Sequence, residues 1–117
     1  MKLTYNRIKQ LNSIFDNIVD HYGFSRYSND LPDLIIIHDD KDGSMGTFED
    51  ESEEIVLNLF NCRTVKDAVG TMIHEYCHYL QPRNGWYDRY ARKYKYNEHP
   101  YEIQANEMAD RDLHLFI

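Results

Sequence analysis

The sequence predicts a small α+β fold with an N-terminal helix, a three-stranded, mostly antiparallel sheet and two later helices. Apolar residues recur at three- and four-residue spacing near the N-terminus and again in the second half of the chain, as in amphipathic helices. Between these segments lie short apolar runs that are separated by turn-forming residues, which is typical of strands. The length of 117 residues and the hydrophobic content of 42% suit one globular domain, residues 1–117.

The N-terminal segment has the periodicity of an amphipathic helix. Its apolar positions are Leu3, Ile8, Leu11, Ile14, Phe15, Ile18, Val19 and Tyr22. Gly23 suits the end of this helix, because glycine readily adopts the left-handed conformation of a C-terminal cap.

Three segments in the middle of the chain are predicted to form the sheet. The run Leu34–Ile37 is apolar at successive positions and rich in β-branched residues, which indicates a central strand buried on both faces. A second strand is expected within Ser44–Glu49. A third is expected within Glu54–Phe60, where every second residue of Ile55–Leu59 points to one face. The acidic residues Glu49–Glu54 are interpreted as a solvated hairpin loop, because they lack the glycine and spacing of a calcium-binding loop.

Two helices are predicted in the second half of the chain. Thr64 is suited to cap the first, which is expected to end near Gln81. Pro100 suits the first turn of the last helix, which is predicted to run toward Leu115. Residues 83–100 between them are polar, basic and aromatic, and are interpreted as a loop with a helical turn at the solvated rim of a cleft.

Charge and hydropathy argue against several classes of partner. The formal net charge of −7 disfavours nucleic acid and anionic membrane surfaces. The longest apolar run is too short to cross a membrane and the N-terminus is too polar for a signal peptide, so a cytoplasmic location is expected. In that compartment Cys62 and Cys77 are expected to be free thiols.

A His-Glu-x-x-His motif, His74-Glu75-Tyr76-Cys77-His78, falls inside the first of the two later helices. At about 100° per residue the two histidines lie roughly 40° apart on one helical face. The apolar stripe of this helix points elsewhere, so both imidazoles are expected to face a cleft. Two such histidines are typical zinc ligands, and the glutamate between them is typical of a general base. Cys77 lies nearer the apolar side and is interpreted as a buried thiol.

A catalytic zinc site needs a third protein ligand and leaves one position for water. The last helix offers Glu102, whose face on a helical wheel carries residues that would permit close packing. These residues are Ala105, Asn106, Ala109, Leu113 and Phe116. Glu107 lies on the far side of this helix and Glu98 precedes it, so Glu102 is the preferred ligand. The other histidines are interpreted as surface or helix-end residues: His21, His38, His99 and His114.

The chemistry expected of these residues is hydrolysis by an activated water. Ligation by His74, His78 and Glu102 would leave Zn²⁺ a strong Lewis acid that lowers the pKa of a bound water to about 7. Glu75 would accept the proton and return it to the departing amine. An oxyanion would need a further donor, and the sequence does not choose among five candidates: Tyr90, Tyr94, Tyr96, Tyr101 and His99.

The two motifs resemble those of known metallopeptidases. His74-Glu75-x-x-His78 and the later segment EIQANEMA, residues 102–109, resemble the H-E-x-x-H and E-x-x-A-N-x-x-A motifs of ImmA/IrrE-type metallopeptidases. The short length and the approach to the third ligand equally resemble the minigluzincins, which are minimal gluzincin catalytic domains. The resemblance covers roughly residues 34–116 in the order of elements, and only the two motifs are specific.

Either resemblance implies a zincin-like fold and a zinc-dependent peptidase acting on a peptide or protein substrate, with an edge strand that aligns the substrate. Minigluzincins include latent forms with a chain end in the cleft, so the apolar tail Leu113–Ile117 is a candidate for blocking the site. The alternative function is a catalytically inactive, zinc-stabilised binding module, such as an adaptor or an antirepressor-like protein. The oligomeric state is left open.

Overall fold

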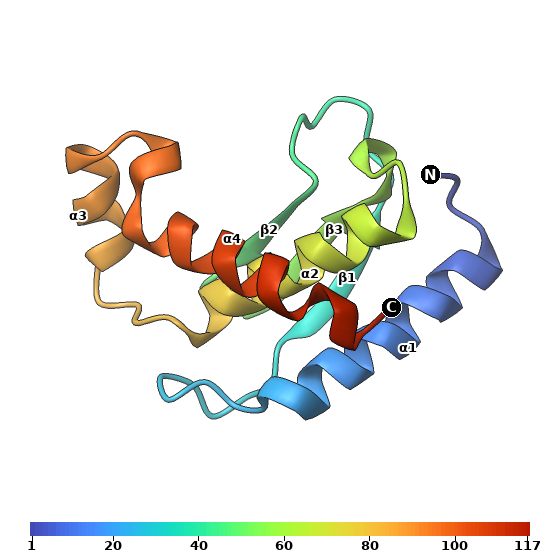
Figure 1. The fold of residues 1–117 in the computed structure, drawn as a ribbon, viewed down its shortest axis with the longest axis horizontal. Coiled ribbons are helices and arrows are strands. Elements are labelled where there is room, and N and C mark those ends of the chain that lie inside the picture. Colours follow the sequence, from blue (N-terminus) through green and yellow to red (C-terminus); the bar gives the residue numbers. More distant parts are fainter.

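A computed structural model describes all of residues 1–117 as an α+β fold with four α-helices and one mixed sheet of three strands. The helices are α1 (Tyr5–Tyr22), α2 (Val65–Leu80), α3 (Trp86–Lys93) and α4 (Pro100–Asp112). The strands are β1 (Asp33–Ile37), β2 (Gly46–Glu49) and β3 (Glu54–Asn58). Short 3-10 helices span Leu59–Asn61, Tyr96–Glu98 and Leu113–Leu115. Figure 1 shows α4 lying along α2, with α3 at the far end of the molecule from α1.

The sheet differs from the predicted one in two respects. Its strand order is β1-β3-β2, with β1 parallel and β2 antiparallel to β3, so the sheet is mixed rather than mostly antiparallel. The chain crosses from β1 to the far edge and returns through a hairpin, which inserts β3 between the other two strands. The expectation of a central strand at Leu34–Ile37 was therefore wrong: β1 is an edge strand, and Ile35 on its outer face is 38% exposed. A continuous apolar run does not distinguish a central strand from an edge strand whose outer face is only partly covered.

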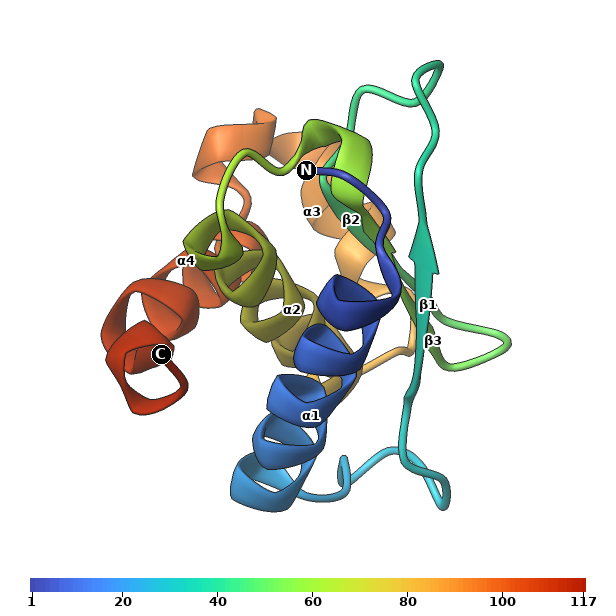
Figure 2. The ribbon, with the colours of Figure 1, turned by 90° about the vertical axis from the view of Figure 1, so that its right-hand side faces the viewer.

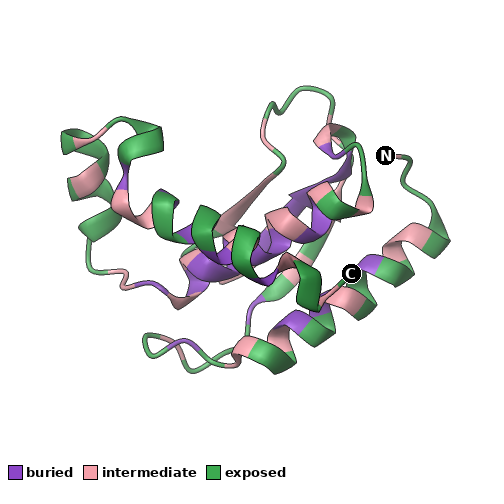
Figure 3. Ribbon diagram, viewed as in Figure 1, coloured by how far each residue is buried: buried purple, intermediate pink, exposed green.

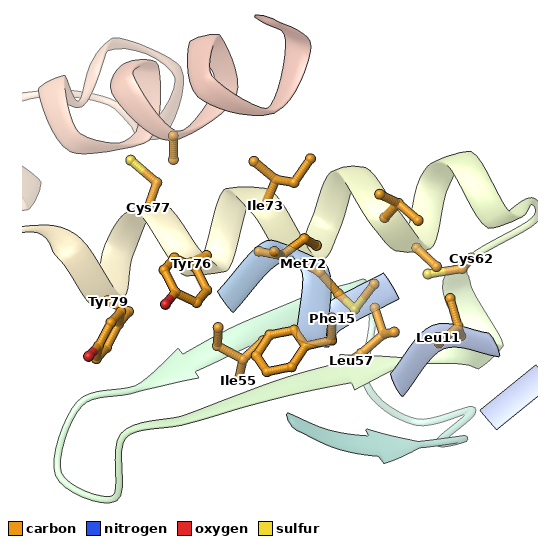
Figure 4. Packing of buried hydrophobic residues seen from close by; sticks show 14 of the residues in the cluster. Leu11, Phe15, Ile55, Leu57, Cys62, Met72, Ile73, Tyr76, Cys77 and Tyr79 are labelled. Atoms are coloured by element: carbon orange, nitrogen blue, oxygen red, sulfur yellow. The ribbon is translucent and has the colours of Figure 1, made fainter. Parts of the chain in front are cut away.

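The core lies between the sheet and the two longest helices. Ile55 and Leu57 of β3 are fully buried, as their alternation predicts. They pack beneath residues of α1 and α2 (Figure 4), among them Leu11, Phe15, Met72 and Tyr76. All the helices lie on one side of the sheet (Figure 2), and α4 packs on α2 without reaching the sheet. Because α2 is covered from both sides, it is the most deeply buried helix (Figure 3).

Local sequence signals fix the helix ends largely as predicted. The Thr64 hydroxyl accepts a hydrogen bond from the Asp67 amide at 3.1 Å and caps α2, which ends at Leu80. Gly23 follows α1 with φ of 72°, a conformation that favours glycine. Pro100 opens α4, which becomes a 3-10 helix after Asp112.

The segment between α2 and α4 is more ordered than predicted. Instead of a loop with one turn, it contains the eight-residue helix α3, which has no buried residue and no side-chain cap. The amphipathic pattern of this helix lies in a mostly polar segment that packs little of its surface against the core, so its sequence indicated only a helical turn. The cysteines behave as expected: Cys62 and Cys77 are both buried and free. None of the helices combines the length and the apolar character that a membrane span requires.

The C-terminal tail does not occupy the cleft. The ring of Phe116 packs against His21 and Tyr22 of α1, with ring centroids 5.6 and 6.1 Å away. Leu113 and Phe116 of the tail therefore pack against the core, whereas Leu115 and Ile117 are exposed. The expectation that Leu113–Ile117 blocks the site is not met by this arrangement, since burial against α1 is available to the same apolar side chains.

Candidate metal centre

Two helices that are distant in the chain bring the three predicted ligands together. His74 and His78 lie one turn apart on α2, on the face that meets α4 rather than the face that meets the sheet. Glu102 lies in the first turn of α4 and is only 3% exposed. Ala105, one turn later, is fully buried, so its small side chain allows the helices to approach closely. One ligand atom from each of the three residues lies within 4.8 Å of the other two.

The donor atoms have the spacing of ligands that surround a single metal ion. Glu102 Oε1 lies 2.9 Å from His74 Nε2 and 3.1 Å from His78 Nε2, and the two nitrogens are 3.3 Å apart. Ligand atoms about 2.0–2.1 Å from zinc in a tetrahedron lie roughly 3.3 Å from one another. Two neutral imidazole nitrogens that face each other at this distance repel unless a proton or a cation lies between them. The residues present therefore fit a divalent metal ion, and this triad could hold one.

Gln81 sets the tautomer of His78. The Gln81 side-chain nitrogen donates to the Tyr101 carbonyl at 3.0 Å and to Gln104 Oε1 at 2.8 Å. Its amide oxygen is then directed at His78 Nδ1, 2.7 Å away. Because that oxygen is an acceptor, Nδ1 carries a proton, so Nε2 is the nitrogen that can ligate a metal ion once the ion displaces the proton shared with Glu102. Gln81 lies just beyond α2, and its position on the histidine face is the only feature of the sequence that points to this role.

Two tyrosine hydroxyls donate to Glu102. Tyr87 on α3 bonds Oε2, and Tyr96 in the 3-10 helix after α3 bonds Oε1 at 3.1 Å. Burial alone would raise the pKa of Glu102, but hydrogen bonds from His74, His78 and Tyr87 outweigh it and hold that pKa well below its usual range. Glu102 is thus a buried carboxylate that stays ionised. Burial, reinforced by Glu102, raises the pKa of Tyr96 to about 12, so this hydroxyl remains a donor at neutral pH.

Glu75 lies beside the triad and is not part of it. Its side chain is largely buried, and its Oε2 is 4.0 Å from His74 Nε2. Burial raises the pKa of Glu75, and the neighbouring histidines only partly offset this effect. Glu75 is therefore a carboxylate of increased basicity, next to the position that a metal ion would take. Such a group can accept a proton from a water molecule.

A cleft of about 530 Å³ opens over these residues. Its floor is formed by the triad and Glu75, one wall by β2, and the other by α3 and the start of α4. A second hollow shares Ser44, Gly46, His74, Glu75 and Tyr96 with the first. These two adjoining hollows are together called the groove.

Gly46 lets β2 approach the centre closely. A Cβ atom at this position would lie 2.7 Å from both the Val56 carbonyl oxygen and the Thr71 side chain. The first of these neighbours is backbone in the adjacent strand and cannot move aside cheaply. The absence of a side chain thus keeps β2 against α2 beside Glu75.

The remaining candidates are separated from the triad. Glu98 and Glu107 are exposed, as are His21, His38 and His114. His99 is a helix-end residue, as expected, but it is buried and caps α4 by accepting a hydrogen bond from the Tyr101 amide. Cys77 is buried and is not part of the group of ligand atoms that converge, in agreement with its interpretation as a buried thiol. Asn106 was expected on the packed face of α4 but is exposed.

Among the tyrosines suggested as oxyanion donors, Tyr96 adjoins the triad, and Tyr101 also lines the cleft. Tyr90 and Tyr94 pack against each other, with ring centroids 6.1 Å apart. Tyr87, which bonds Glu102 directly, was not among the candidates, because nothing in the local sequence pattern distinguishes it from its aromatic neighbours.

Comparisons with known proteins return no match: no family model fits the chain, and no curated protein or solved structure is significantly similar to it.

Proposed function

We propose that this protein is a zinc-dependent peptidase of the gluzincin type, with His74, His78 and Glu102 as metal ligands and Glu75 as the general base. The observation that carries the proposal is the convergence of two imidazole nitrogens and one carboxylate oxygen on a common point in a cleft. A basic, largely buried carboxylate adjoins that point. The His-Glu-x-x-His motif alone would be a weaker argument, because it states nothing about a third ligand.

The donor set favours zinc over the harder cations. Two nitrogens and one oxygen suit Zn²⁺, whereas Mg²⁺ and Ca²⁺ prefer sites built from oxygen alone. Three protein ligands leave a fourth position open, which is the pattern of a catalytic rather than a structural site. When bound there, the metal would supply Lewis acidity, polarising a water molecule and a substrate carbonyl.

Glu75 would act first as the general base and then as the general acid. Its raised pKa brings its basicity closer to that needed at neutral pH, and its position beside His74 places it next to the open side of the centre. After accepting a proton from water, the same carboxyl group would return it to the amine that departs. Tyr96 also adjoins the triad through its bond to Glu102, and its protonated hydroxyl is suited to donate to a developing oxyanion.

A peptide or protein is the substrate that suits the groove. β2 pairs with β3 along one edge only, so its other edge keeps free backbone donors and acceptors beside Glu75. An extended peptide can pair with such an edge. The second hollow extends the open surface beyond the cleft toward Asn106 and Leu113 of the C-terminal region, which suits cleavage within a chain.

The test separates catalysis from metal binding. Purified protein loaded with Zn²⁺ is assayed against a broad peptide library, alongside Glu75→Gln and His74→Ala. We expect chelator-sensitive cleavage by the wild type and a loss of about 10²–10⁴-fold in kcat for Glu75→Gln, because the general base is removed. The zinc content of Glu75→Gln should remain stoichiometric, whereas that of His74→Ala should fall.

Two results would argue against the proposal. Zinc-loaded wild type that cleaves no peptide while retaining stoichiometric metal would favour the alternative, an inactive zinc-stabilised binding module. Cleavage that persists in Glu75→Gln would remove Glu75 from the reaction.

A further inference from the structure

Tyr87 is held at both its side chain and its backbone. Its hydroxyl donates to Glu102 Oε2. Its carbonyl accepts a hydrogen bond of 2.9 Å from His99 Nε2, and its ring stacks on the His99 ring with centroids 4.1 Å apart. The Tyr87 ring also meets the His78 ring in an edge-to-face arrangement, with centroids 5.8 Å apart. The tyrosine thus bridges a metal-ligating histidine and a buried histidine that belongs to another element.

His99 connects this bridge back to the helix that carries Glu102. It is 1% exposed, and its Nδ1 accepts a hydrogen bond of 3.1 Å from the Tyr101 amide in the first turn of α4. Since Nδ1 is an acceptor, Nε2 carries the proton that it donates to Tyr87. The contacts form a closed circuit from Glu102 through the Tyr87 side chain, the Tyr87 carbonyl and His99 to the start of α4.

The circuit restricts the Glu102 carboxylate to one orientation. With Oε2 bound to the Tyr87 hydroxyl, Oε1 alone faces the two imidazole nitrogens. A carboxylate that is free to rotate could offer both oxygens to a cation, since carboxylates bind metals through one oxygen or two. A ligand held through one oxygen keeps the coordination number low and leaves an open position.

We infer that Tyr87, fixed in place by His99, is a positioning residue that holds Glu102 as a one-oxygen ligand. This inference rests on the metal centre proposed above. It gives a function to α3, which is otherwise exposed and adds no buried residue to the core. Polar partners of metal ligands typically contribute 10–100-fold to metal affinity, and Tyr87 should contribute on that scale.

The experiment compares Tyr87→Phe with Tyr90→Phe. The first variant removes one hydroxyl and keeps the ring contacts with His78 and His99. The second removes a hydroxyl from a neighbouring ring that also packs on His99 but makes no bond to Glu102. For each protein, Co²⁺ affinity is measured by competition with a chromophoric chelator, and the visible absorption of the Co²⁺ complex is recorded. Far-ultraviolet circular dichroism checks folding, which should be unaffected because Tyr87 is 38% exposed.

We expect Tyr87→Phe to bind Co²⁺ about 10–100-fold more weakly than the wild type, with less intense visible bands. Intensity should fall because a second carboxylate oxygen raises the coordination number above four, and four-coordinate Co²⁺ absorbs more strongly. Tyr90→Phe should match the wild type in both measurements. Should Tyr87→Phe also match it, or should both variants weaken binding equally, the positioning role is refuted while the metal centre stands.

The failure of the proposed function gives a different result. Wild type that binds no Co²⁺, or that binds it equally well after His74→Ala, would overturn the metal centre and the inference together. Wild type that binds Co²⁺ but cleaves no peptide would overturn only the peptidase proposal, since neither affinity nor absorption depends on turnover.

Discussion

Helix α4 carries a buried carboxylate at each end, and the two differ in what neutralises them. Glu102 near the N-terminus and Asp112 at the C-terminus are 3% and 7% exposed. Each accepts a tyrosine hydroxyl, Tyr87 at Glu102 and Tyr22 at Asp112. Asp112 also accepts two hydrogen bonds from the Arg111 guanidinium, at 2.8 and 3.0 Å. Glu102 faces two imidazoles instead.

The difference lies in the charge of the partners. A guanidinium is always protonated, so Asp112 has a permanent counter-charge. An imidazole is charged only when it binds a proton, and near neutral pH a cation can take the place of that proton. Burial disfavours the charged form of His78, yet hydrogen bonding to Glu102 and the charge of Glu75 raise its pKa overall. The comparison teaches that a buried carboxylate with a tyrosine is not in itself a functional site. The exchangeable counter-charge is what distinguishes Glu102.

The largest effect should come from removing the charge of the Glu102 carboxylate itself. Structural zinc binding is worth about 10–16 kcal/mol, or roughly 3 kcal/mol for each of four ligands, so a lost ligand should cost more than about 100-fold in affinity. Glu102→Gln should therefore reduce Zn²⁺ affinity by at least that factor in a chelator competition assay. Asp112→Asn is the matched control and should retain the wild-type affinity. Equal losses in both variants would mean that the helix as a whole, and not the carboxylate, governs metal binding.

A smaller loss of Zn²⁺ affinity should follow from replacing Gln81, the hydrogen-bond partner of the His78 imidazole. Gln81→Met removes the acceptor for His78 Nδ1, which should reduce Zn²⁺ affinity by about 10–100-fold because the ligating tautomer is no longer fixed. Gln81→Glu keeps an acceptor at that position and should largely preserve affinity, although it loses the donor to the Tyr101 carbonyl. Isothermal titration of Zn²⁺ into both variants gives the comparison. If both variants bind Zn²⁺ equally weakly, the affinity depends on the contact that Gln81 makes between α2 and α4 and not on the tautomer of His78.

The smallest effect should be a loss of folding stability when the other buried carboxylate, Asp112, is replaced. Hydrogen bonds from Arg111, which outweigh burial, lower the pKa of Asp112 from 3.8 to about 2. Above pH 3.8 the group is ionised in the folded and unfolded states, and its full stabilisation is present; that stabilisation is lost as pH falls toward 2. Asp112→Asn should therefore lower the free energy of unfolding by about 1–2 kcal/mol at pH 7.

The pH dependence of this variant provides its check. Urea denaturation of the wild type and Asp112→Asn between pH 7 and pH 2 should show a constant difference above about pH 5 that shrinks below pH 4. A difference that does not change with pH would mean that packing at this site, and not the charge of Asp112, determines the loss.

Much of the architecture could be predicted because its signals are local. The ends of α1, α2 and α4 follow from residues such as Gly23, Thr64 and Pro100, whose backbone preferences act within one turn. The burial of Ile55 and Leu57 follows from alternation along a single strand. The order of the strands could not be predicted in this way, because it depends on which segments pair across the sheet. Helix α3 was missed because its amphipathic pattern faces a cleft rim rather than a core.

By itself the sequence determined which residues could act as ligands. The spacing of His74 and His78 places them on one face of any helix, and the wheel of the last helix separates Glu102 from Glu107. Only the tertiary structure decided that these faces meet, that Glu102 presents Oε1 alone, and that Gln81 and Tyr87 fix the orientation of the donors. The physical reason is that helical periodicity fixes directions within one element. Distances between elements depend instead on how α2 packs between the sheet and α4.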